Sequence, residues 1–123
     1  MSAYNWLRCE GICPSCGRKT CLLAQTHFAS SHGGDESGRF HDHIFAVGDR
    51  MPWFSSDHHH FAEWPSREGA SDQPGDEVEA CYASCESCEA KLYVVVRFRD
   101  FRPIEVVQVG LEDRWPQEYG VYR

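Results

Sequence analysis

The stretch CEGICPSCG (residues 9–17) has an echo at CYASCESC (residues 81–88), and both copies space their cysteines in the pattern C-x3-C-x2-C. Six of the seven cysteines of the chain lie in these two stretches. A two-residue gap lets two thiolates bind one metal ion from a tight turn, with metal–sulfur distances of about 2.3 Å for zinc. The pattern therefore predicts one tetrahedral zinc site, with ligands Cys13, Cys16, Cys85 and Cys88.

The two C-x-x-C turns differ in the residues around their cysteines. In the first turn, Pro14 presets φ after the first cysteine, and Gly17 can adopt the left-handed conformation after the second. The second turn has Glu86 and Glu89 at these positions. A thioredoxin-like redox pair needs only one C-x-x-C, at the start of a helix. Two copies followed by β-like sequence favour a metal site.

Two C-x-x-C turns that face each other across one metal ion resemble the knuckles of the zinc-ribbon group. The resemblance covers residues 13–17 and 85–88 with their flanking segments, about a third of the chain. It implies a ribbon-like β-sheet in which the four inner cysteines bind one structural Zn²⁺. Iron is the alternative metal, and zinc is favoured because nothing near the thiolates indicates redox chemistry.

The sequence departs from a simple ribbon in the separation of the two knuckles. The inner cysteine pairs are separated by residues 17–84, where a simple ribbon has about 15–20 residues. Loop-closure entropy grows only logarithmically with length, so a long insertion is tolerated. We therefore expect a single zinc-ribbon-like domain over residues 1–123, with an irregular insertion at about residues 27–76.

The sequence allows several roles for the remaining cysteines, Cys9, Cys21 and Cys81. Cys9 and Cys81 each precede their knuckle by four residues, so a pseudo-twofold ribbon makes them equivalent positions. They could pair with each other, exchange with a ligand, or serve as small buried apolar residues, which is the favoured interpretation. Cys21 is expected to be an ordinary strand residue.

Alternating apolar and polar residues predict a mainly β protein. The clearest signal is LYVVVRF (residues 92–98), in which Leu92, Val94, Val96 and Phe98 share the face expected in the core. A turn near residues 100–102 and a strand at 104–109 complete a predicted C-terminal β-hairpin. Further strands are expected at residues 4–10, 40–47 and 78–83, whereas residues 18–26 suit a strand or a helical turn.

Aromatic residues crowd the segment from Arg50 to Pro65 without a regular period. Its two prolines argue against a long helix. The side chains either cap the core of the insertion or form a loop that binds a partner, since aromatic anchors on loops commonly build interfaces. The candidate partner-binding residues are Trp53, Phe54, Phe61 and Trp64.

Histidines of the insertion offer a possible second metal site. Alternate residues of a strand point to one face, so His41 and His43 could bind an ion together with one of His58, His59 and His60. A hydrolytic zinc centre would also need an open position for water and a base such as Glu63. The competing interpretation, that these are surface histidines without a metal, is favoured because neither H-x-H nor H-H-H has the spacing of a known catalytic motif.

Charge and composition narrow the functional classes. The formal net charge is −7, and residues 22–90 hold 13 acidic but only three basic side chains. Phosphate binding needs a basic face, so this distribution disfavours nucleic acid as the main partner. The chain shows no signal segment, no long apolar run and an odd number of cysteines, which together predict a reducing, cytoplasmic location without a membrane anchor.

These observations favour a small structural-zinc protein that binds another protein, an adaptor or inhibitor-like module, through its acidic, aromatic insertion. A partner with a basic surface would match its charge. One alternative is a nucleic-acid-associated regulatory zinc ribbon that uses Arg97, Arg99 and Arg102 beside Phe98 and Phe101. A histidine-metal hydrolase is a weaker alternative. An enzyme is disfavoured, because the sequence has no nucleophile elbow, phosphate loop or dinucleotide fingerprint.

Overall fold

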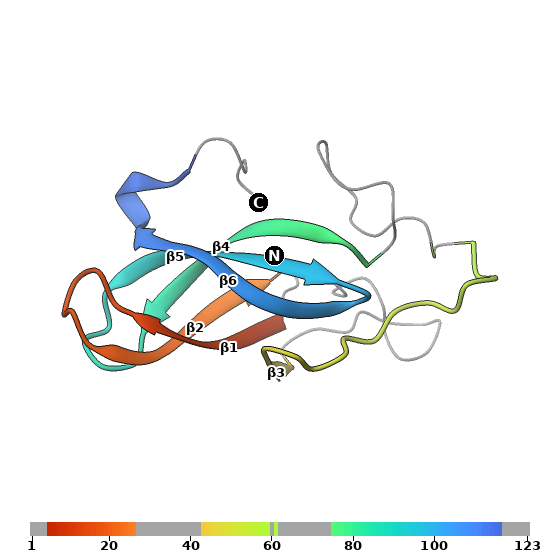
Figure 1. The fold of residues 1–123 in the computed structure, drawn as a ribbon, viewed down its shortest axis with the longest axis horizontal. Helices are drawn as coiled ribbons and strands as arrows, with labels where there is room; N and C mark the ends of the chain where they lie inside the picture. The colour runs from red at the N-terminus through yellow and green to blue at the C-terminus, as the bar shows by residue number, and fades with distance from the viewer. Residues whose placement is uncertain (1–4, 27–42, 60, 62–74, 117–123) are drawn as a thin grey trace.

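Six strands form one mixed sheet in the computed structural model, which describes residues 5–26, 43–59, 61 and 75–116. The strand order is β3-β1-β2-β4-β5-β6, and every neighbouring pair is antiparallel except β1 and β3 (Figure 1). A single 3-10 turn, η2 (Glu112–Arg114), follows the last strand. The strands are β1 (Asn5–Ile12), β2 (Lys19–Thr26), β3 (Ile44–Ala46), β4 (Glu77–Cys85), β5 (Lys91–Arg99) and β6 (Arg102–Leu111).

The mainly β prediction is confirmed, with differences at the ends of elements. Residues 19–26 form a strand and not a helical turn, because their backbone pairs with β1 on one side and β4 on the other. Strand β4 continues to Cys85, so the second knuckle begins on the strand itself. Strand β3 is shorter than predicted at three residues, and positions 40–42 of the predicted strand lie outside the described residues.

The sheet curls into a half-barrel whose concave face holds the main core. Curling brings the edge strand β6 towards β1, and a Cβ placed on Gly11 would lie 3.8 Å from Cγ2 of Val109. The predicted core face of β5 is confirmed, since its four residues are at most 1% exposed. The other buried inward positions include Leu7, Cys9, Leu22, Ala24, Ala83 and Cys85.

The outer face of β5 is also covered, which the alternating pattern did not predict. Tyr93 and Val95 are buried with Ala80, and Trp115 packs against this second cluster. The Trp115 ring lies 6.1 Å from the Tyr93 ring. The segment after β6 therefore shields the middle of the sheet on its outer side.

A carboxylate is buried inside the half-barrel, near the start of β4 and away from the two knuckles. Glu79 is 0% exposed, and its Oε1 accepts a hydrogen bond of 2.6 Å from the Thr26 hydroxyl. The Cys81 thiol lies 3.2 Å from the same oxygen. A buried polar group needs such donors because leaving water without them is costly.

The predicted β5–β6 hairpin is confirmed, and its tip is held by other segments. Asp100 and Phe101 form a two-residue turn with φ angles of 51° and 63°, the double left-handed geometry that matches the twist of paired strands. The Phe101 N–H donates to the Gly75 carbonyl at 3.1 Å, and the Phe101 carbonyl accepts from Met51 N–H at 2.8 Å. The Asp100 N–H donates to Asp76 Oδ1 at 2.9 Å. The segments before β4 and after β3 therefore meet at this tip.

The predicted insertion at residues 27–76 is not wholly separate from the sheet. Its strand β3 pairs in parallel with β1 through Trp6↔Ile44, Leu7↔Phe45 and Arg8↔Ala46. After β3 the chain runs along the end of the half-barrel opposite the knuckles (Figure 1). Within the described residues, no helix is long and apolar enough to cross a membrane.

Candidate metal centre

Sheet pairing places the two knuckles side by side. The first knuckle, Cys13–Cys16, lies in the turn between β1 and β2, and the second, Cys85–Cys88, begins at the end of β4 and leads into β5. Strands β2 and β4 pair through Leu22↔Cys85, and Glu86 N–H donates to the Cys21 carbonyl at 3.1 Å. Both turns therefore emerge at the same end of the sheet (Figure 1).

The two knuckles have matching backbone hydrogen bonds. In the first, Gly17 N–H donates to the Cys13 carbonyl at 2.8 Å, and in the second Glu89 N–H donates to the Cys85 carbonyl at 2.8 Å. Each first cysteine also donates its own N–H across the turn, to Arg18 O at 3.0 Å and to Ala90 O at 3.1 Å. The repeated cysteine motif therefore forms the same turn in both copies.

The four predicted ligand sulfurs converge. The Sγ atoms of Cys13, Cys16, Cys85 and Cys88 all lie within 4.8 Å of one another. Two of these approaches join the knuckles, at 3.7 Å between the Sγ atoms of Cys13 and Cys88 and 4.0 Å between those of Cys16 and Cys85. A tetrahedron with zinc–sulfur distances of about 2.3 Å has edges of about 3.8 Å. The cluster therefore has the size needed to hold one metal ion.

Backbone N–H groups point at the sulfurs of each first cysteine. Cys13 Sγ accepts from Ser15 N–H at 3.3 Å and from Cys16 N–H at 3.5 Å, and Cys85 Sγ accepts from Ser87 N–H at 3.3 Å. These donors stabilise thiolates and fix their orientation, the part that outer hydrogen bonds play at metal sites. Cys13 and Cys85 are buried, whereas Cys16 is half-buried and Cys88 is exposed.

Because the sulfurs lie close together, the pKa values of the Cys85 and Cys88 thiols differ. Burial raises the pKa of the Cys85 thiol, but the N–H groups of Cys88 and Ser87 and the neighbouring thiols outweigh it and bring the pKa to about 7. At Cys88 the N–H of Ala90 lowers the pKa, yet desolvation and the other three thiols raise it to about 11. Because metal ions bind thiolates, binding releases the remaining protons, and affinity should rise with pH.

Gly17 and Glu89 occupy equivalent left-handed positions, with φ angles of 72° and 62°. This conformation costs a residue with a side chain roughly 1–2 kcal/mol, partly offset by the greater entropy that glycine loses on folding. We expect Glu89→Gly to raise the free energy of unfolding by about 0.5–1 kcal/mol. Gly17→Ala should lower it by about 1 kcal/mol through the backbone alone, because a Cβ at Gly17 meets nothing within 4 Å. Urea unfolding of the metal-loaded protein measures both, and changes of the same sign would contradict the proposed equivalence.

The three other cysteines, Cys9, Cys21 and Cys81, lie outside the cluster and form no disulfide. Cys9 and Cys81 are 1% and 2% exposed, which agrees with their favoured interpretation as small buried residues. Burial, with a smaller contribution from Cys21, raises the pKa of Cys9 to about 11, so this thiol stays protonated at neutral pH. Cys21 is a half-buried residue of β2, as expected.

The described histidines do not form a second metal cluster. Within residues 5–26, 43–59, 61 and 75–116, the four cysteines are the only group of three or more His, Cys, Asp and Glu residues with converging ligand atoms. The His58 ring stacks on Phe54 at 4.5 Å and on His59 at 4.5 Å. His43 precedes β3, and its N–H donates to Asn5 Oδ1 at 3.1 Å. His41, His60 and the candidate base Glu63 lie outside the described residues.

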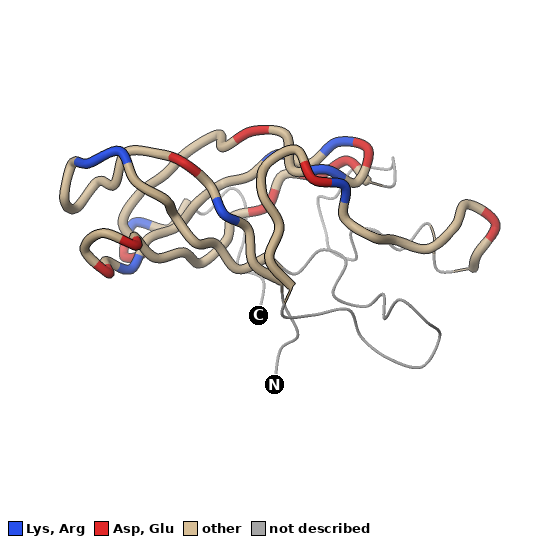
Figure 2. Tube along the Cα trace, turned by 90° about the horizontal axis from the view of Figure 1, so that it is seen from below, with Lys and Arg blue, Asp and Glu red and all other residues tan. Residues whose placement is uncertain are grey.

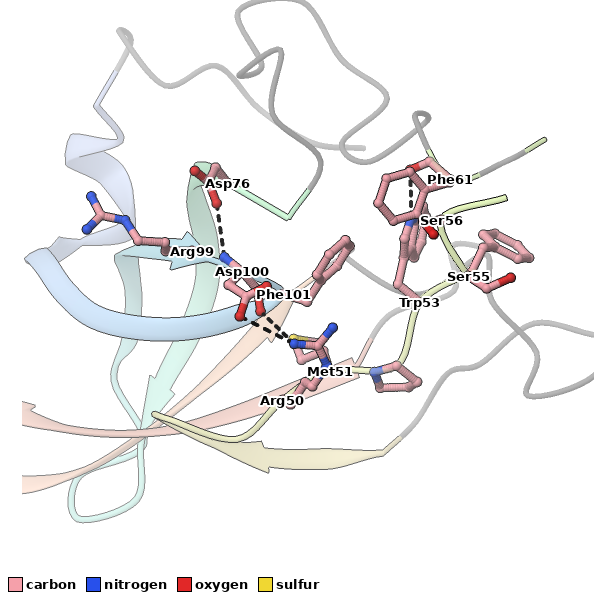
Figure 3. A pocket seen from close by; sticks show the side chains of 12 residues that line it. Arg50, Met51, Trp53, Ser55, Ser56, Phe61, Asp76, Arg99, Asp100 and Phe101 are labelled. Atoms are coloured by element: carbon pink, nitrogen blue, oxygen red, sulfur yellow. Dashed lines mark hydrogen bonds and ion pairs between the residues drawn. The ribbon is translucent and has the colours of Figure 1, made fainter. Parts of the chain in front are cut away.

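Three of the four candidate partner-binding aromatics, Trp53, Phe54 and Phe61, line an open groove of about 1000 Å³ at the end of the half-barrel opposite the knuckles (Figure 3). Trp53 donates its indole N–H to the Phe61 carbonyl at 2.9 Å, and its ring lies edge-on to Phe54 at 5.0 Å. Phe61 lies 5.9 Å from Phe101 of the hairpin tip. Trp64, the fourth candidate, is outside the described residues. The hairpin tip forms the opposite wall of the groove, which the sequence alone did not predict.

The residues named for the nucleic-acid alternative differ in their exposure to solvent. Phe98 is 1% exposed in the core. Phe101 is 6% exposed because Arg50 and Phe61 lie against its ring, so neither ring is open for stacking on bases. Arg97 pairs with Glu105 at 2.8 Å. Lys and Arg are interspersed with Asp and Glu over the described part of the chain (Figure 2). What remains to support this alternative is the exposed pair Arg99 and Arg102.

No protein-family model matches the sequence, and no curated protein or solved structure matches it significantly. The likeness to zinc ribbons therefore rests on the two knuckles and extends no further.

Proposed function

We propose that this protein is a small zinc-stapled β scaffold that binds another protein through the groove at the far end of its half-barrel. The observation that carries the proposal is the closed set of four cysteines. Four protein sulfurs fill the tetrahedral positions of zinc and leave none for a substrate or water, as in structural and unlike catalytic sites. The metal holds the scaffold, and binding takes place elsewhere.

Two features support protein as the partner. The groove combines aromatic side chains with exposed polar groups, the composition typical of interface anchors surrounded by a polar rim. Its aromatic wall stands on a non-helical segment beside a hairpin tip that three hydrogen bonds fix in place. Binding residues are commonly placed on loops that a rigid framework positions.

Quantitative affinity capture from a nuclease-treated extract tests this role. We expect a set of proteins retained by the wild type to be lost with the variant Trp53→Ser/Phe54→Ser. The matched control is Ile104→Ser/Val107→Ser, which removes two exposed apolar residues, 38% and 41% exposed, from the outside of β6. Equal capture by both variants would refute the proposal. Retention of nucleic acid at physiological salt, in a parallel capture from an extract without nuclease, would refute it as well.

A further inference from the structure

The hairpin tip binds the side chain of Arg50 at the edge of the groove. Nη1 of Arg50 lies 3.4 Å from the Asp100 carboxylate and 3.4 Å from the Asp100 carbonyl. The guanidinium carbon of Arg50 lies 5.3 Å from the centre of the Phe101 ring. The two charged side chains of this pair are 54% and 70% exposed, so it is weak and readily exchanged.

Four charged side chains line the groove, two carboxylates and two guanidiniums. Asp76 is tied to the hairpin tip, because its Oδ1 accepts a hydrogen bond from the Asp100 N–H. The Arg99 side chain extends away from Trp53 and Phe61 (Figure 3). Arg50 is therefore the guanidinium held against Asp100 and Phe101 at the edge of the groove.

The opposite wall is apolar and lies within reach of the same tip. Trp53 and Phe54 are half-buried and form this wall together with Pro52, above the buried Met51. One groove could therefore accommodate two neighbouring groups of a ligand. A cation would lie over the Phe101 ring, and an apolar side chain would lie against Trp53 and Phe54.

We propose that the groove binds a protein segment that carries an arginine or lysine next to an apolar residue. The partner's cation takes the position over Phe101 and Asp100 that Arg50 now holds, and Arg50 acts as a competing internal cation. This inference rests on the proposed function, and it specifies the partner's chemistry. The Asp100 carboxylate and the Phe101 ring already hold one guanidinium, which argues for a basic segment over an acidic one or a nucleic acid.

The probe is a random 12-residue peptide display library selected on the immobilised, metal-loaded protein. Enriched peptides are expected to contain an arginine or lysine adjacent to a large apolar residue, and to lose binding to Trp53→Ser/Phe54→Ser. The best peptide, labelled with a fluorophore, then serves for affinity measurement by anisotropy at physiological salt.

Two pairs of variants separate the cation position from net charge. Arg50→Ala and Arg102→Ala each remove one positive charge from the same tip, but only Arg50 lines the groove. Loss of a weak ion pair and a cation–π contact predicts about three- to tenfold tighter binding for Arg50→Ala, and less than about twofold change for Arg102→Ala. Asp100→Asn should weaken binding about three- to tenfold, whereas Asp113→Asn, on η2, should not.

The outcomes distinguish the inference from the function on which it rests. Enrichment of acidic or uncharged peptides that still need Trp53 and Phe54 would overturn the basic-partner inference and leave the protein-binding role standing. Equal effects of Arg50→Ala and Arg102→Ala would also overturn it, because bulk charge would then explain the change. Failure to enrich any peptide dependent on Trp53 and Phe54 would count against both. Thermal unfolding of each variant verifies that the fold is retained.

Discussion

Replacement of Cys85 by serine is expected to release the metal ion and abolish the cooperative unfolding transition of the domain. Cys85 is 1% exposed and joins the second knuckle to the sheet next to Leu22. Structural zinc sites contribute roughly 10–16 kcal/mol in zinc-finger peptides, as much as the whole stability of an ordinary domain, about 5–15 kcal/mol. Elemental analysis and thermal unfolding followed by circular dichroism measure the two effects.

The matched control is Cys21→Ser, which changes a half-buried cysteine of β2 outside the four-sulfur cluster. It should keep the metal and lose less than about 1 kcal/mol of stability. If Cys85→Ser retained both metal and a sharp transition, the site would not hold the fold together. A loss of metal by Cys21→Ser as well would mean that general thiol chemistry, and not the cluster, binds the ion.

Truncation of Phe98 is the second change with a large expected effect. Its side chain is 1% exposed and lies on the inner face of β5, in the main core of the half-barrel. Phe98→Ala removes a large apolar group and leaves a cavity, which together should lower the free energy of unfolding by about 3–5 kcal/mol.

Urea unfolding of the metal-loaded protein measures this loss. Val107→Ala serves as the control, because Val107 is 41% exposed on the neighbouring strand β6 and should cost less than about 0.5 kcal/mol. A loss below about 1 kcal/mol for Phe98→Ala would contradict the packing of β5 against the concave core.

Local spacing was sufficient to predict the cysteine cluster and the C-terminal hairpin. A C-x-x-C turn brings its own two sulfurs together, and the repeat of the pattern indicated a second pair. The period of two in residues 92–98 assigned Phe98 and its neighbours to the core, because alternate strand residues share a face.

Features that depend on long-range pairing were not predictable in this way. The buried Glu79 is an example, since nothing local distinguishes it from exposed acids such as Glu86 and Glu89. Its burial follows from the placement of Thr26, far away in the sequence, at hydrogen-bond distance. Strand β3 likewise gains its parallel partner only through the fold of the insertion.

Two turns were predicted at the right places but adopt conformations that their residue types alone do not favour. Glu89 adopts the left-handed conformation that Gly17 supplies in the first knuckle, because both copies have the same backbone hydrogen bonds. The hairpin tip uses Asp100 and Phe101 at left-handed angles without a glycine. There, hydrogen bonds to Gly75, Asp76 and Met51 stabilise a turn whose residues alone would not favour it.

The most direct test of a shared metal site is X-ray absorption at the zinc edge, on protein purified without a histidine tag. Four sulfur neighbours at about 2.3 Å and no nitrogen or oxygen neighbour are expected, with one zinc per chain. A spectrum with nitrogen or oxygen neighbours, or metal-free protein in which Cys13, Cys16, Cys85 and Cys88 are oxidised to disulfides, would contradict the account.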